Sequence, residues 1–209
     1  MPNYVINKVV INGSVETISK VKKQILNYDD GEGNVSDFSF QTIIPRPKSL
    51  DIENSTMVDK AIEYIRANDD EKALIKSTYF QDKEYYEKYI SLANKAIENI
   101  KKYGYKDWYD WNRNNWGTKW DAMEVSVDAD DTTISLDFQT AWSTPEPVFL
   151  ELAKQYPDIT IQVEYADEDL GHNCGTYTYE DGSWSYIDGS YKFACEMWGL
   201  GPEEYAVED

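Results

Sequence analysis

The order in which two hydrophobic patterns follow each other constrains the fold of this chain more than any other feature. Four segments carry the alternating, β-branched or aromatic residues that are typical of strands: 4–11, 123–127, 133–140 and 159–165. Two others, 15–28 and 145–156, repeat their apolar residues at helical spacing. With the intervening residues set aside, the order is βαββαβ, which is the split βαβ or ferredoxin-like pattern. We therefore predict an α+β protein with an antiparallel sheet and both helices on one sheet face.

The segments outside this pattern are shorter. A hairpin is expected over 177–187 around Asp181-Gly182, so that the sheet gains an additional C-terminal hairpin. A final short helix is expected over 190–198. The stretch FSFQTII at 38–44 is predicted to be extended, ending at Pro45-Arg46-Pro47.

A helical insertion interrupts the ferredoxin-like pattern. Helices are predicted over 57–68, 70–79 and 82–103, and Gly104 stands at the position after the last helix, where glycine often ends one. The expected organisation is a ferredoxin-like domain built from residues 1–50 and 107–190, a helical insertion at 51–106, and a C-terminal helix and tail at 191–209.

The chain is strongly acidic, with 39 Asp and Glu against 20 Lys and Arg and a net charge of −19. Such a charge repels the phosphate backbone of nucleic acids and anionic membranes, so direct binding to either is disfavoured. A protein with a basic surface would be attracted instead. The same charge also has a simpler interpretation, because acidic residues improve solubility.

The sequence has no pattern of an exported or membrane-spanning protein. Its start, MPNYVINKVVING, lacks a basic region followed by an apolar run, and no stretch approaches the roughly 20 apolar residues of a membrane span. The two cysteines, Cys174 and Cys195, lack C-x-x-C spacing. Free thiols in the cytoplasm are therefore expected, with a disulfide left as an alternative.

Four of the seven tryptophans fall within DWYDWNRNNWGTKWDA, at 108, 111, 116 and 120. In one interpretation they form a buried Trp-rich core at the junction of insertion and sheet, which Trp142 joins from a neighbouring strand end. In the other, Trp116, Lys119, Trp120 and Asp121 line a cleft that binds a partner or a small ligand. Trp142 is then a further candidate contact residue. The first interpretation is favoured, because carboxylates surround the indoles.

No catalytic constellation is recognisable. His172 is the single histidine, and a couple with Cys174 two positions later is geometrically conceivable but disfavoured. Structural zinc is improbable, because it takes about four nitrogen or sulfur ligands and the chain has three candidates. The chain also lacks the glycine-rich phosphate loops. We predict no catalytic residue, no metal site and no cofactor.

An acidic run begins within the last predicted strand of the βαββαβ pattern and continues beyond it. Glu164, Asp167, Glu168 and Asp169 lack the spacing of a calcium-binding loop, so a solvated surface or a contact with a basic partner is expected rather than a metal site.

Two stretches also resemble a known family. They are NWGTKWDA at 115–122 and FQTAWSTPEPVFLELAKQYPDI at 138–159, accompanied by MPNYVINKVVING and FSFQTIIPRP near the start. Together they resemble the YubB-like family of phage- and plasmid-borne proteins of unknown function, which have a ferredoxin-like domain. The resemblance implies a mobile-element protein in the cytoplasm of a bacterial host cell, and it brings no known catalytic residue.

Three functional hypotheses follow. The favoured one is a non-enzymatic acidic protein that binds a host or phage protein, as an anti-CRISPR or anti-restriction inhibitor would by mimicking nucleic acid. The second is an enzyme or small-ligand binder that uses the cleft from Trp116 to Asp121. The third is a ferredoxin-like module that stacks single-stranded nucleic acid on sheet aromatics.

Overall fold

The computed structural model describes residues 3–201 and divides the chain into two compact units. Unit 1 is formed by Met1–Pro45 and Arg113–Asp209, and unit 2 by Arg46–Asn112. Part of the predicted C-terminal tail, residues 202–209, lies outside the described residues.

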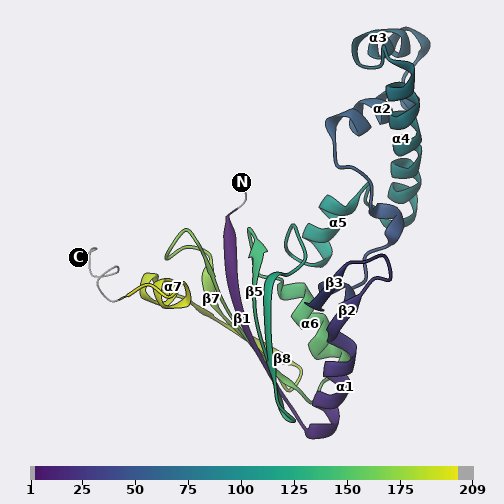
Figure 1. Cartoon of the computed structure of the whole chain (residues 1–209). Coiled ribbons are helices and arrows are strands. Elements are labelled where there is room, and N and C mark those ends of the chain that lie inside the picture. The colour runs from purple at the N-terminus through teal and green to yellow at the C-terminus, as the bar shows by residue number, and fades with distance from the viewer. Residues whose placement is uncertain (1–2, 202–209) are drawn as a thin grey trace. The chain divides into compact units, whose positions relative to one another are not determined.

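Unit 1 is built on a six-stranded antiparallel sheet in the order β4-β5-β1-β6-β7-β8. Its strands are β1 (Tyr4–Asn12), β4 (Met123–Ala129), β5 (Thr133–Ala141), β6 (Thr160–Asp167), β7 (Cys174–Glu180) and β8 (Ser183–Asp188). Figure 1 shows α1 (Val15–Ile25) and α6 (Glu146–Gln155) on one side of this sheet. The chain order β1-α1-β4-β5-α6-β6 is the ferredoxin-like pattern, and β7 and β8 extend the sheet at one edge. The predicted fold class and the additional hairpin are confirmed.

The core of unit 1 lies between the sheet and the two helices. Alternate residues of β1, namely Val5, Val9 and Ile11, are buried on this side because successive side chains of a strand point to opposite faces. Phe138 of β5 meets Phe149 of α6 with 6.2 Å between ring centroids. Aromatic packing thus joins the second predicted helix to the middle of the sheet.

Two local predictions in this unit are wrong. The helix predicted over 15–28 ends at Ile25, because the chain passes directly into β2 (Leu26–Asp29), which pairs with β3 (Val35–Phe38). The stretch 38–44 is extended only at its start, and its centre is a short 3-10 helix, Phe40–Thr42. Ser39 begins that turn, since its hydroxyl accepts the Gln41 N–H at 3.1 Å.

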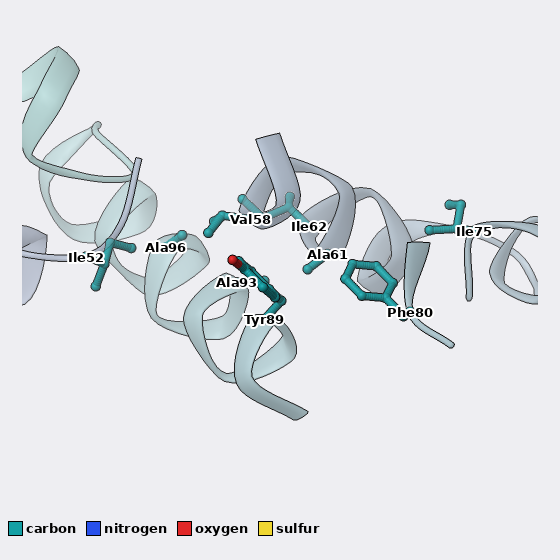
Figure 2. Close-up of a cluster of buried hydrophobic side chains, with 9 residues drawn as sticks. All are labelled: Ile52, Val58, Ala61, Ile62, Ile75, Phe80, Tyr89, Ala93 and Ala96. Atoms are coloured by element: carbon teal, nitrogen blue, oxygen red, sulfur yellow. The ribbon is translucent and has the colours of Figure 1, made fainter. Parts of the chain in front are cut away.

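Unit 2 is helical. A short 3-10 turn (Lys48–Leu50) precedes α2 (Thr56–Arg66), α3 (Asp69–Tyr79) and α4 (Lys83–Tyr103), and α5 (Trp108–Asn115) begins in this unit. Asn68 and Glu71 form a reciprocal capping box at the start of α3, and Gly104 adopts φ +83° after α4. Figure 2 shows the buried cluster that holds the helices together: Ile52, Val58, Ala61, Ile62, Ile75, Phe80, Tyr89, Ala93 and Ala96.

The last helix, α7 (Tyr191–Met197), lies on the side of the sheet opposite α1 and α6 (Figure 1). Its Ala194 and Met197 form a small buried cluster with Ala166 and Cys174, against which Ile6 packs. This helix therefore covers only one end of that sheet face. Among residues 3–201, no helix is long and apolar enough to cross a membrane.

Candidate functional site

The two tryptophan-containing stretches that stand out in the sequence meet at one end of the unit 1 sheet. The Thr118 hydroxyl donates a hydrogen bond to the Ala141 carbonyl at 2.7 Å, and the Ser143 hydroxyl donates to the Gly117 carbonyl. Gly117 adopts φ +80°, in the left-handed region that glycine favours. Side-chain hydrogen bonds thus join the turn at 117–119 to the turn at 142–143.

Neither Ser143 nor Thr144, which precede α6, caps that helix. The residue before α6 is Pro145, which makes no side-chain capping bond. Ser143 is engaged by Gly117, and the buried Thr144 hydroxyl has no hydrogen-bond partner among the described residues. Ser143 therefore joins the two turns and does not begin the helix.

Trp116 is part of the core rather than of a binding surface. Its side chain is 1% exposed, its indole N–H donates to the Ile44 carbonyl at 2.9 Å, and its ring packs edge-on against Phe40. Trp108 and Trp111 belong to unit 2, where Trp111 is buried. The four tryptophans of the segment therefore divide between the two units.

Asp121 also stabilises the fold. Its carboxylate accepts hydrogen bonds from the Ser39 hydroxyl at 2.6 Å, the Phe40 N–H at 2.8 Å and the Ala122 N–H at 2.8 Å. It thereby fixes the 3-10 turn that replaces the predicted extended segment. These three hydrogen bonds give the Asp121 carboxylate a structural role.

Lys119 lies between two indoles. Its ammonium nitrogen is 4.6 Å from the centre of the Trp120 ring and 4.8 Å from the centre of the Trp142 ring. The Arg113 guanidinium carbon is 5.9 Å from the same Trp142 ring. These are cation–π distances, so two cations share one half-exposed tryptophan. Arg113, in the last turn of α5, was not among the predicted site residues because no periodic pattern links it to Trp142.

A cavity of about 260 Å³ opens beside this group. The residues that line it are Arg113, Asn114, Gly117, Thr118, Lys119, Trp142 and Ser143. Of the predicted cleft residues, the structure thus places Lys119 in the lining of this cavity, beside Trp142, whereas Trp116 and Asp121 support the surrounding backbone.

The predicted acidic run does not form one cluster. Asp167 is buried and accepts from the side-chain amides of Asn3 at 3.2 Å and Asn173 at 2.9 Å. Glu168 and Asp169 are exposed, and Glu164 lies on the sheet face opposite α1 and α6. Among residues 3–201, no group of three or more His, Cys, Asp or Glu side chains could hold a metal ion.

The cysteines are buried and free. Cys174 is on β7 and Cys195 on α7, and burial raises the pKa of the Cys174 thiol. His172 is exposed in the loop before β7. A protonated, buried thiol is a poor nucleophile, so this end of the sheet offers no Cys–His couple.

Thiol chemistry should follow this burial. We expect neither cysteine of the folded protein to react at an appreciable rate with a chromogenic disulfide reagent, and both to react after denaturation. The measurement is the number of thiols titrated before and after adding denaturant. One rapidly reacting thiol in the folded protein would contradict the burial of its side chain.

Almost all of the net negative charge of the chain belongs to unit 1. Unit 2 carries 12 Lys and Arg against 13 Asp and Glu, a net charge of −1. Unit 1 carries 8 against 26, a net charge of −18. If the acidity served solubility alone, no such division would be needed, because both units present charged surface to water.

The sheet face opposite α1 and α6 is polar and acidic. In the strand register, Lys8 of β1 lies directly between Asp137 of β5 and Glu164 of β6. Directly paired residues share a face, so these three form one row. Asp128 of β4 and Glu180 of β7 lie on the same face, nearer its two edges.

Three tyrosines of β6 and β7 point the other way. Tyr165, Tyr177 and Tyr179 lie on the helix side of the sheet, where burial raises the pKa of each phenol. The rows of the opposite face that pair with Lys8, Val10 and Asn12 carry no aromatic side chain. The stacking platform that single-stranded nucleic acid uses on ferredoxin-like sheets has no counterpart in these rows.

Comparison with known proteins supports the fold and leaves the activity open. Residues 115–208 match the model of a family described as the ferredoxin-like domain in Api92-like protein. A crystal structure of a protein api92 from Yersinia pseudotuberculosis is similar at 10% identity and a TM-score of 0.46, covering 91% of this chain and 99% of that chain. No curated protein matches the chain. The matched region is thus similar to a ferredoxin-like domain, in agreement with the order of its strands and helix.

Proposed function

We propose that this protein is a non-enzymatic binding module whose acidic unit 1 binds a basic surface of another protein. The observation that carries the proposal is the division of charge, −18 in unit 1 against −1 in unit 2. A field of one sign concentrated on one unit steers an oppositely charged partner to that unit and gives the encounter an orientation.

The sheet face opposite α1 and α6 is the surface that we assign to the partner. It presents Asp128, Asp137, Glu164 and Glu180 around Lys8, the single cation in the six described strands of the sheet, and α7 covers only one of its ends. An antiparallel face with hydroxyl and amide side chains between the carboxylates can pair with Lys and Arg side chains without burying an isolated charge.

The partner that fits this chemistry is a protein whose basic surface normally receives nucleic acid. The resemblance to YubB-like proteins of phages and plasmids suggests which partner this is: a host defence enzyme, which the chain inhibits by occupying its DNA or RNA site. In contrast, the third hypothesis, stacking of single-stranded nucleic acid, has no aromatic platform in the central rows of the sheet face to support it.

A pair of double variants tests this assignment. Asp137→Asn with Glu164→Gln removes two carboxylates from the sheet face while conserving side-chain shape. We expect it to weaken binding of a basic host protein, captured from bacterial lysate by the immobilised full chain, by at least about fivefold. Duplex DNA should release the captured protein, and binding should fall as ionic strength rises.

The matched control is Glu84→Gln with Glu98→Gln, which makes the same charge change on exposed positions of α4 in unit 2. It is expected to leave the affinity unchanged. Equal weakening by both double variants would show that only net charge matters. No weakening by the first, or no competition by DNA, would refute the sheet face as the partner site.

A further inference from the structure

The cavity beside Trp142 has a charge opposite to that of the unit that contains it. Both ionisable residues that line it, Arg113 and Lys119, are cations, and no Asp or Glu is among its lining residues. From residue 113 to the end of the chain there are four Lys and Arg against 21 Asp and Glu. Half of those four cations therefore line one small cavity, while Lys154 and Lys192 lie elsewhere, on α6 and α7.

Two cations at one indole repel each other. The Trp142 ring attracts both, at 4.8 Å from the Lys119 nitrogen and 5.9 Å from the Arg113 guanidinium carbon. An anion that enters between them relieves their mutual repulsion and gains charge-assisted hydrogen bonds from both. Arg and Lys together are also the usual protein donors for phosphate and carboxylate groups.

The rim of the cavity is held in a strained conformation. Trp142 has φ +75°, which is a rare value for a large side chain. Its N–H donates to the Asn3 carbonyl at 2.9 Å, and its own carbonyl accepts from the Asn173 amide at 3.0 Å. The same two asparagines donate to the buried Asp167 carboxylate, so one buried anion orients both partners of the Trp142 backbone.

A second polar chain supports the next residue. The buried Asn7 amide donates to the Thr140 hydroxyl at 2.9 Å, and that hydroxyl donates to the Ser143 carbonyl at 2.8 Å. Strained backbone that is fixed by several independent hydrogen bonds is typical of binding sites, where it holds the contact groups in place before the ligand arrives.

From these observations we propose that the cavity binds a small oxyanion, a phosphate or carboxylate group, between Arg113 and Lys119 against the edge of Trp142. At about 260 Å³ the cavity lies below the range of about 300–1,000 Å³ that is usual for drug-sized ligands, so it fits a single anionic group rather than a whole nucleotide. This site is separate from the acidic sheet face and does not depend on the partner proposed for it.

The test is a titration of the full chain with inorganic phosphate at constant ionic strength, following the Trp142 indole N–H by NMR. That signal is assigned by its loss in Trp142→Phe. A saturable shift is expected with phosphate, and parallel titrations with acetate and with sodium chloride separate the phosphate and carboxylate sources from a salt effect. Lys119→Gln should weaken binding by at least about tenfold.

Two further variants separate charge from packing. Lys119→Arg keeps a cation beside the indoles and should bind phosphate within about threefold of the unaltered chain. If the role of Lys119 were purely structural, Lys119→Arg and Lys119→Gln would weaken phosphate binding to the same extent. Lys154→Gln removes one exposed positive charge from α6 and should leave binding unchanged. The proposal fails if neither phosphate nor acetate gives a saturable shift, or if Lys119→Gln and Lys154→Gln weaken binding equally.

Discussion

Replacing Trp116 with alanine is expected to lower the free energy of unfolding of unit 1 by about 3–5 kcal/mol. The indole is 1% exposed and packs against Phe40, so its removal leaves a large void in the core. The change also leaves the Ile44 carbonyl without its indole N–H donor. Urea denaturation followed by circular dichroism measures the effect.

Trp184→Ala is the matched control, because it removes the same side chain from β8, where it is 56% exposed. We expect it to cost about 1 kcal/mol or less. The comparison also tests the second interpretation of the tryptophan-rich segment, in which Trp116 lines a binding cleft. If Trp116 lined such a cleft, Trp116→Ala would affect stability no more than Trp184→Ala does.

The fold could be predicted because its elements are encoded locally. Alternation in residues 133–140 and helical spacing in 145–156 each reflect the face that the element buries, and the order of such elements leaves few topologies. The segment 38–44 could not be predicted in the same way. Its aromatic residues favour a strand, but Asp121, about 80 positions away, accepts from Ser39 and Phe40 and stabilises a 3-10 turn.

The candidate site shows a similar division. The spacing of Trp116, Lys119 and Trp120 predicts a candidate binding cleft in this segment. The structure places Lys119 next to Trp142. The local sequence alone cannot tell which indole is buried, because Trp116 and Trp142 each lie between one polar and one small residue. The difference arises from tertiary contacts: Phe40 covers Trp116, whereas a strained turn leaves Trp142 38% exposed.

The burial of Asp167 also could not be predicted from the local sequence. In the sequence it is one of a run of carboxylates, which indicates a solvated surface. In the fold it is buried, and it orients Asn3 and Asn173 beneath the Trp142 turn. The two side-chain amides that it accepts from are 164 and 6 residues away, so the acidic run itself does not distinguish Asp167 from the exposed Glu168 beside it.

Gly117→Ala should destabilise unit 1 by more than about 2 kcal/mol and should also disturb the oxyanion cavity. A Cβ at this position would lie 2.7 Å from Cδ of Pro147, and the backbone has φ +80°. The proline ring is rigid and belongs to the first turn of α6, so no change of rotamer relieves the contact. The strain must instead move the 117–119 turn, which carries Lys119, away from Trp142.

Gly182→Ala separates the two parts of this effect. Gly182, in the turn between β7 and β8, has φ +72°, but no atom lies within 4 Å of an added Cβ. The backbone cost alone is about 1 kcal/mol, so the excess destabilisation by Gly117→Ala measures the close approach of Gly117 to Pro147. Equal free energies of unfolding for the two variants would show that an added Cβ at Gly117 does not clash with the Pro147 ring. In that case phosphate binding by Gly117→Ala should also remain intact, because the turn that carries Lys119 would not have moved.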